Sequence, residues 1–351
     1  MTRYGAGTHR TGTGGGRHRR IDAGPAGHPA RMKLLAILAA LAFEQWRAFE
    51  WRVAIERGFR EYARAIEQRF NGGTRGQGII AAVIAILPPV AAVALVWVLL
   101  DSAHPLLGLL LDIAVLYLLM GFRHFSHAIS LIIVALKGGD LVGARRALAA
   151  WRGVSSSELS SQDVARLAIE RGFTDAYRQV FAVLFWFVVL PGPAGAVLYR
   201  TAALLATQWK GVLPGDDASV IARSLAVFGR PARRLLWLLD WLPARLTALS
   251  FAAVGDFEDA IYCWRTQARH WPAAMGGETM GLVLATGGGA LGVQLGGPLP
   301  GIGGEPELRP DVGTGEPVEV EVLPSAVGLV WRALVLWLLP VFLLSLANWA
   351  P

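Results

Sequence analysis

The chain has very little cysteine and little charge. Its 351 residues include one cysteine, Cys263, which excludes an internal disulfide and any metal cluster built on cysteines. Charged residues make up 17% and hydrophobic residues 54% of the chain, whereas an average soluble domain has about 25% charged residues. One soluble core cannot hide so many apolar side chains. The composition therefore indicates a membrane protein, in which Cys263 is expected to be a packing residue.

Several catalytic signatures are also missing. The sequence has no GxxxxGK[ST] phosphate loop and no Gly-x-Ser-x-Gly elbow. Residues 287–292 match GxGxxG, but a dinucleotide site needs a βαβ unit around this pattern, and none is predicted. His124 and His127 stand three residues apart with no third ligand near them, so we expect local hydrogen bonding rather than metal binding. No metal site is predicted.

The first 31 residues have a composition of their own. They contain six arginines and one aspartate, which leaves only about +2 of the net charge of +7 for the remaining residues. This leader has no apolar periodicity and no apolar core of a secretory signal, and we expect it to be disordered. Met32 opens a run typical of a membrane-protein start, so residues 1–31 are expected to be a start-site artefact. Because the basic residues do not follow a folded face, nucleic acid is not an expected partner.

Apolar stretches of the length of a bilayer occur along the rest of the chain. A crossing helix needs about 20 apolar residues, and spans are expected near residues 79–100, 105–121 and 325–350. Asp112 lies inside the second of these and is expected to face the protein interior. Residues 180–198 are apolar too, but Pro191-Gly192-Pro193 interrupts them, which favours a re-entrant or broken helix. Residues 32–351 are thus expected to form one all-α, polytopic membrane domain.

The segments between these stretches are basic and mostly helical. Arginines are concentrated in residues 44–77, 123–178 and 199–270, which places these segments in the cytoplasm by the positive-inside rule, in a bacterial-type inner membrane. Helices are expected over 44–70, 140–151 and 162–179 from the spacing of apolar residues. The only strand signal is a weak alternation at Val318–Val322, after a Gly/Pro-rich linker at 296–317.

Three motifs in order resemble the CobD/CbiB family of cobalamin-biosynthesis membrane proteins. Residues 192–200, GPAGAVLYR, are similar to the family's GxPGAxxYK. Residues 240–248, DWLPARLTA, are similar to NWIPARLTA, and residues 289–298, GALGVQLGGP, to GALGVRLGGP. The resemblance runs from about residue 125 to the C-terminus.

The same comparison shows where the chain departs from the family pattern. Residues 169–179, IERGFTDAYRQ, stand where the family has VESVAENTSDG. The family's NTLD becomes ALLA at 203–206, and its RLDD becomes RLLW at 234–237. The N-terminal GDPxxxHPV is replaced by the stretch that begins at Phe43-Glu44-Gln45-Trp46. These departures are more similar to AmpE, a related membrane protein linked to β-lactamase regulation.

The resemblance implies an enzyme that joins an aminopropanol-type amine to the carboxylate of adenosylcobyric acid, with ATP and Mg²⁺ as cofactors and a corrinoid as substrate. Membrane lipid is the other expected partner. The implied catalytic residues are Glu170, Asp175 and Asp240. The implied substrate-binding residues are Tyr199, Arg200, Arg245, Gly289, Gly292, Gly296 and Gly297. Two alternatives stay open: an AmpE-like membrane sensor or regulator without catalysis, and a transporter of a small anion that uses the broken segment.

Overall fold

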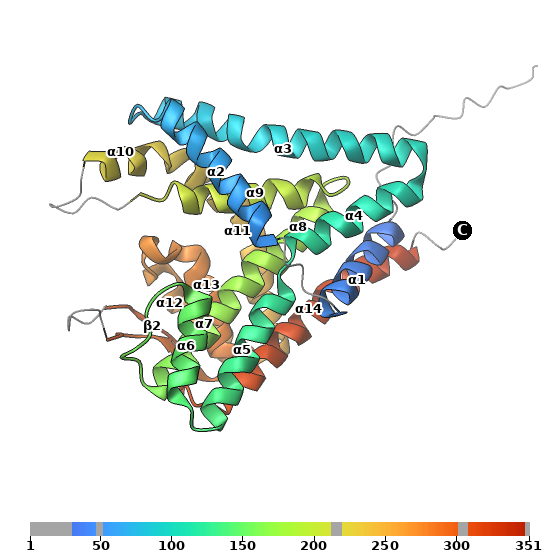
Figure 1. Ribbon diagram of the computed structural model, residues 1–351. Helices are drawn as coiled ribbons and strands as arrows, with labels where there is room; N and C mark the ends of the chain where they lie inside the picture. The colour runs from blue at the N-terminus through green and yellow to red at the C-terminus, as the bar shows by residue number, and fades with distance from the viewer. Residues whose placement is uncertain (1–29, 47–51, 212–219, 301–307, 348–351) are drawn as a thin grey trace, which may run out of the picture.

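The computed structural model describes residues 30–46, 52–211, 220–300 and 308–347, and confirms a mainly all-α fold (Figure 1). The expected leader lies outside these residues, except for its last two positions. In chain order the helices are α1 (Ala30–Trp46), α2 (Arg52–Phe70), α3 (Arg75–Ala103), α4 (Pro105–Leu119), α5 (Phe122–Lys137), α6 (Leu141–Arg152), α7 (Ser161–Ala176), α8 (Ala182–Val189), α9 (Ala194–Gln208), α10 (Val220–Phe228), α11 (Arg230–Val254), α12 (Phe257–Gln267), α13 (Gly277–Leu291) and α14 (Val322–Ala347). A π-helical turn, Tyr177–Phe181, joins α7 to α8, and short 3₁₀ turns occupy Ala268–His270 and Ala273–Met275.

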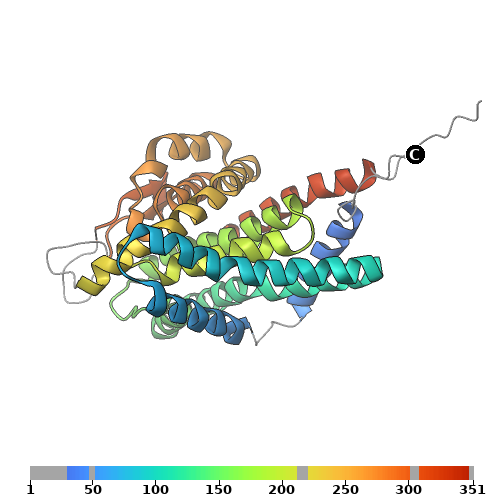
Figure 2. The ribbon, with the colours of Figure 1, turned by 90° about the horizontal axis from the view of Figure 1, so that it is seen from above.

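Three helices among the described residues are long and apolar enough to cross a membrane. They are Arg75–Ala103, Arg223–Val254 and Val322–Ala347. The helix α4 is apolar but has 15 residues, about 22 Å at 1.5 Å per residue, against a hydrocarbon core of about 30 Å. The helix α4 is thus shorter than a full crossing. It folds back along α3, which is about twice as long (Figures 1 and 2).

The helix Arg223–Val254 lies in a stretch that the sequence assigned to the cytoplasm. Most of its arginines gather at the start of the helix and Asp240 is buried within the fold, so the rest of its surface is apolar apart from Arg245. Trp237, Leu238 and Trp241 are among the exposed apolar side chains of this surface. This helix was not predicted from the sequence, because a continuous run of residues without charge was expected of a crossing helix. The burial of the one carboxylate, Asp240, is decided by tertiary packing and cannot be read from such a run.

The apolar stretch 180–198 folds as a helical hairpin. The helix α8 ends at Val189, and α9 begins at Ala194 and packs back against α8. Gly192 adopts a positive φ of 61°, and a Cβ at this position would lie 2.5 Å from the Trp97 ring. Pro193 is the N-cap residue of α9, where its fixed φ and missing N–H do no harm. The turn thus requires glycine at position 192 and accommodates proline at position 193.

The core of the fold lies where the α7–α8 rod meets α11 and α14. Phe173 and Phe181 both pack on Phe251, with ring centroids 5.2 and 6.0 Å apart, and Phe181 also contacts Trp337. Cys263, on α12, is fully buried, and burial raises the pKa of its thiol to about 11. The thiol therefore stays protonated at neutral pH, as a packing residue would.

The glycine-rich segment 287–289 is the interior of α13, not a loop. It lets α13 approach its neighbours closely, since a Cβ on Gly289 would lie 2.6 Å from the Asp259 carbonyl oxygen and 2.8 Å from Ala260 Cα on α12. A helical segment with no preceding strand does not form the phosphate turn of a dinucleotide site. The GxGxxG match therefore reflects helix packing.

We expect Gly289→Ala to lower the free energy of unfolding by about 1–3 kcal/mol, because its methyl group would meet backbone atoms that cannot move aside. Gly58→Ala is the matched control: Gly58 is also inside a helix, but a Cβ there would have no atom within 4 Å. The control is expected to be neutral or to stabilise the protein by up to about 1 kcal/mol. Denaturant unfolding in detergent micelles measures both. Equal effects of the two variants would contradict the packing explanation.

A small three-stranded sheet follows α13. The strand β1 (Val293–Gly296) pairs antiparallel with β2 (Asp311–Gly313) and parallel with β3 (Glu316–Pro317), in the order β2-β1-β3. The strand expected at Val318–Val322 is wrong, since Val322 already begins α14. Two of the strands end in glycines with positive φ, Gly296 and Gly313. Strands of two to four residues are too short for an alternation of apolar and polar residues to reveal them. Part of the expected linker therefore has regular structure.

Candidate functional site

A buried carboxylate held by two tyrosines is the centre of the candidate site. Asp240, on α11, is 2% exposed. Its Oδ1 accepts a hydrogen bond from Tyr177 Oη at 2.6 Å and another from Tyr199 Oη at 2.8 Å. Tyr177 comes from the π-helical turn and Tyr199 from α9, so three separate elements fix this carboxylate. The other oxygen, Oδ2, has no hydrogen-bond partner within the described part of the chain.

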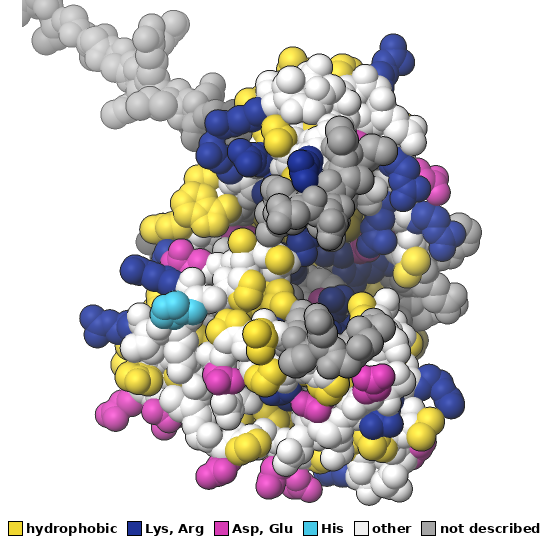
Figure 3. Space-filling view, turned by 90° about the vertical axis from the view of Figure 1, so that its left-hand side faces the viewer, with side chains coloured by type: hydrophobic (Ala, Val, Ile, Leu, Met, Phe, Trp, Pro, Cys, Tyr) yellow, Lys and Arg dark blue, Asp and Glu magenta, His cyan; other side chains and the backbone are white. Residues whose placement is uncertain are grey.

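Asp240 lines a cavity of about 470 Å³, here called the first cavity. Arg178 and Lys210 are two of its cationic residues, and the Nε atom of Arg178 is buried without a hydrogen-bond partner among the described residues. Figure 3 shows Lys and Arg side chains gathered around a hollow on this side of the molecule. The full lining is Thr174, Arg178, Ala206, Thr207, Lys210, Arg233, Leu236, Trp237, Asp240, Ala273, Ala274, Met275, Gly276, Gly277, Thr279 and Met280.

Two cations of the first cavity already donate to backbone oxygens of the fold. Lys210 Nζ donates to the carbonyl oxygen of Ala274. Arg233 donates to the carbonyl oxygens of Trp209 at 2.9 Å, Lys210 at 3.0 Å and Ala226 at 2.6 Å, and thereby ties the ends of α9 and α10 together. Arg178 and Asp240 are consequently the charged pair best placed to meet a ligand. The cavity can hold an anionic group at Arg178 and a hydrogen-bond donor at Asp240.

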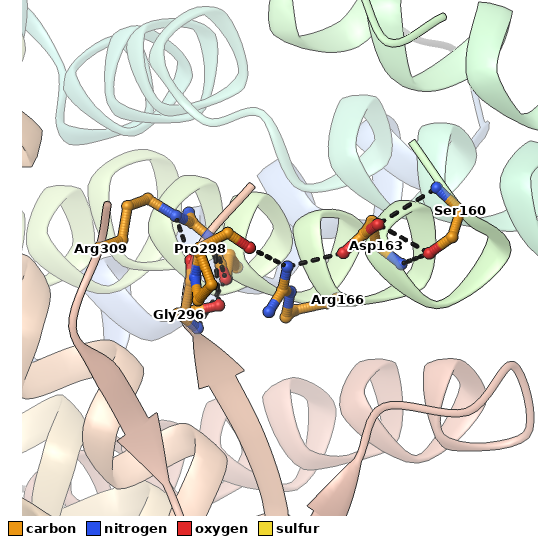
Figure 4. Close-up of polar contacts among 8 residues, drawn as sticks. Ser160, Asp163, Arg166, Gly296, Pro298 and Arg309 are labelled. Carbon is orange, nitrogen blue, oxygen red and sulfur yellow. Dashed lines mark hydrogen bonds and ion pairs between the residues drawn. The ribbon is translucent and has the colours of Figure 1, made fainter. Parts of the chain in front are cut away.

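Glu170 lies elsewhere, in a structural ion pair with Arg309. Figure 4 shows Arg309 beside Gly296. Its Oε2 is 2.7 Å from Arg309 Nη1, and its Oε1 accepts from Arg309 Nη2 at 3.2 Å and from the backbone N–H of Gly296 at 2.8 Å. Arg309 also donates to the carbonyl oxygens of Gly296 and Gly297. Both side chains are almost fully buried. The pair fastens the turn after β1 onto α7, and Arg309, in the expected linker, carried no motif that would have revealed it.

Asp175 belongs to a third cluster. Its Oδ2 accepts from Trp151 Nε1 at 3.0 Å and from Arg171 Nε at 3.1 Å, which joins α6 to α7. The structure thus distributes the three expected catalytic carboxylates among separate partners. Among the expected site residues, Tyr199 contacts Asp240 directly, and Glu170 contacts the backbone of Gly296.

The remaining expected binding residues are dispersed too. Arg245 lies at the surface of α11, with its guanidinium 4.4 Å from the Trp241 ring centroid and 3.8 Å from Glu278. Gly292 ends α13 in the left-handed conformation, whereas Gly296 and Gly297 form the turn beside Arg309. These glycines lie against protein atoms or at helix ends, and none lines the first cavity.

Arg200 lines a different cavity, here called the second cavity, of about 460 Å³. Its Nη2 donates to Glu56 Oε1, and Glu56 also pairs with Arg52 and Arg60, each at 3.3 Å. Figure 2 shows α2, which carries Glu56, and the α12–α13 unit on opposite sides of the molecule. The full lining is Glu44, Arg52, Val53, Glu56, Arg60, Tyr117, Met120, Arg123, His127, Arg171, Gln179 and Arg200. Within the described ranges, no group of three His, Cys, Asp or Glu residues could hold a metal ion.

Glu44, in the second cavity, makes protein stability depend on pH. Burial raises the pKa of its carboxyl from 4.5 to about 7, although Arg52 opposes this rise. Between these values the unfolded chain gives up its proton first, so stability falls as pH rises from about 4.5 to about 7 and is then constant. Since one unit of pKa corresponds to about 1.4 kcal/mol, the total loss is roughly 3 kcal/mol.

We expect Glu44→Gln to remove most of this fall in stability, because the amide stays neutral. Thermal unfolding in detergent between pH 5 and pH 8 measures the difference between the variant and the unmodified chain. Glu258→Gln, at an exposed position on α12, is the control and should keep the original pH profile. Parallel profiles for Glu44→Gln and the unmodified chain would contradict the assignment.

The sequence of the chain is similar to those of known proteins. The family model described as CobD/Cbib protein matches residues 34–330. A protein named Cobalamin biosynthesis protein CobD from Stutzerimonas stutzeri is 37% identical over 285 residues, which cover 80% of this chain and 88% of that protein. The protein of the same name from Chromobacterium violaceum is 36% identical over 284 residues, 81% and 84% of the two chains. No solved structure is significantly similar.

Proposed function

Because the chain belongs to the CobD/Cbib protein family, we propose that it forms the amide bond between an aminopropanol-type amine and the free carboxylate of adenosylcobyric acid. This is the reaction that the family resemblance implies for a membrane protein of cobalamin biosynthesis. The observation that carries the proposal is the first cavity, where a carboxylate oriented by two tyrosines lies in a cationic pocket.

The charged groups of the first cavity other than Arg233 each have a role in this reaction. Arg178 and Lys210 attract the carboxylate of the corrinoid or a phosphate group. Asp240 Oδ2 accepts the proton of the attacking amine while the amine nitrogen bonds to the carbonyl carbon of the activated carboxylate, and the activating phosphate group leaves with the electrons of the broken C–O bond. Tyr177 and Tyr199 hold Oδ1, so that Oδ2 keeps one direction. Amide formation also needs an activated carboxylate, which ATP supplies when bound.

The cavity suits the two implied cofactors unequally. Cationic side chains match the phosphate oxygens of ATP in charge and hydrogen bonding. Magnesium is usually bound through one or two carboxylates together with substrate phosphates, and Asp240 is the one carboxylate in the lining, beside cations. The lining therefore fits the phosphates and does not fit a magnesium ion held by the protein.

A second candidate function rests on the same cavity. Five residues at which the chain departs from acidic positions of the family pattern line it: Thr174, Arg178, Ala206, Leu236 and Trp237. These positions, far apart in the sequence, converge on one space. Their replacement favours a membrane sensor or regulator that binds a ligand there without turning it over.

Full-length protein in lipid nanodiscs, supplied with adenosylcobyric acid, ATP, Mg²⁺ and aminopropanol or its phosphate, distinguishes the two functions. Formation of the amide product, followed by mass spectrometry, is the expected result. The chain should also restore corrinoid-dependent growth to a strain that lacks the synthase. Corrinoid binding without product, together with failure to complement, would overturn the synthase and favour the regulator.

A further inference from the structure

The second cavity contains more cations than its acidic residues can neutralise. Arginines from four elements face it, namely Arg52 and Arg60 on α2, Arg123 on α5, Arg171 on α7 and Arg200 on α9. Its carboxylates are Glu44 and Glu56. Asp175 pairs with Arg171 from outside the lining. Even with this aspartate included, cations exceed carboxylates by two.

Two of the five arginines are largely removed from solvent, whereas Arg60 and Arg171 are 53% and 40% exposed. The side chains of Arg52 and Arg200 are 14% and 11% exposed, and both share the single carboxylate of Glu56. Arg52 is held in place by Met120, whose carbonyl oxygen accepts from Nη1 at 2.7 Å, and by Gln179, whose Oε1 accepts from Nη2 at 3.1 Å. Buried charges are normally paired, and two guanidinium groups beside one carboxylate leave a charge for a ligand to neutralise.

Hydrogen-bond donors remain around this space. A guanidinium has five N–H donors, whereas Arg171 uses Nε for Asp175 and Arg60 uses Nη2 for Glu56. Glu44 is 5% exposed, and its Oε2 has no hydrogen-bond partner among the described residues. The cavity thus presents several donors for an oxyanion and one acceptor for a hydroxyl hydrogen of the ligand.

We propose that the second cavity binds a phosphate group. A phosphate dianion neutralises an excess of two cations, and guanidinium groups bind its oxygens in pairs. Tyr117 and Met120, at the end of the apolar helix α4, also line the cavity, so the phosphate can come from a soluble phosphate ester or from the headgroup of an anionic phospholipid. This site does not depend on amide formation in the first cavity.

The test uses full-length protein in phosphatidylcholine nanodiscs, with hydrogen–deuterium exchange of residues 52–70 as a local readout. Inorganic phosphate is expected to slow exchange in α2 at least threefold. Arg60→Gln should raise the phosphate concentration needed by fivefold or more, and Arg171→Gln serves as a second variant on another helix. Arg57→Gln is the matched control, since Arg57 is on the same helix but outside the cavity lining.

A second arm distinguishes the two sources of phosphate. In nanodiscs containing phosphatidylglycerol, a lipid headgroup would slow α2 exchange without added phosphate, and Arg60→Gln would remove this protection. Slower exchange only on addition of inorganic phosphate would assign a soluble ester. No change in α2 under either condition, or equal effects of Arg57→Gln and Arg60→Gln, would overturn the site.

Discussion

Replacing Asp240 with asparagine is expected to lower the turnover of amide formation at least a hundredfold. An amide cannot accept the proton of the attacking amine, and general base catalysis typically contributes 10²–10⁴-fold to the rate. The variant keeps the size of the side chain and can still accept hydrogen bonds from Tyr177 and Tyr199. The fold should therefore survive. Initial rates at saturating substrates measure the effect.

Two further variants give this prediction its controls. Tyr199→Phe removes one of the hydrogen bonds that orient the carboxylate, and we expect a smaller loss, about tenfold. Glu258→Gln changes an exposed carboxylate remote from the first cavity and should leave turnover unchanged. A substrate-dependent rate in Asp240→Asn equal to that of the unmodified chain would remove Asp240 from the reaction. Tryptophan fluorescence and thermal unfolding check that each variant is folded.

Glu170→Ala is expected to lower the free energy of unfolding by about 3–5 kcal/mol. The substitution leaves the Arg309 guanidinium, which is 5% exposed, without its bidentate partner, and an uncompensated buried charge is costly. It also frees the backbone N–H of Gly296. Denaturant unfolding in mixed micelles measures the loss. The same variant in the amide-forming assay should reduce turnover only as far as it reduces the folded fraction.

A double-mutant cycle with Arg309→Met tests the origin of this loss. Replacing both partners by apolar residues should cost clearly less than the two single losses added together, because neither charge is then left alone. The pair Arg245–Glu278 is the control. Its Nη2 and Oε1 atoms are 3.8 Å apart, and the two side chains are 34% and 48% exposed. Glu278→Ala should cost about 1 kcal/mol or less. Additive losses at Glu170 and Arg309 would contradict the buried ion pair.

Part of the candidate site was evident before the fold was known. Asp240 and Tyr199 lie in two of the motifs that resemble the family, and the structure joins them by a hydrogen bond. Glu170 matches the family pattern within a stretch that otherwise departs from it, yet its partner Arg309 is 139 residues away and makes it a structural clamp. Local sequence identifies the residue but not the role, because the role depends on which distant side chain shares its space.

The broad character of the protein follows from its sequence alone. Few charges, long apolar runs and helical spacing are local properties, and they predicted an all-α membrane protein. Three short motifs, which are also local, indicated the CobD/Cbib family. Tertiary structure decided the features that depend on long-range packing: the burial of Asp240 in an apolar helix, the sheet formed by glycine-rich strands, and the two cavities. A cavity is a space between elements, so no single stretch of the chain encodes its shape or its charge.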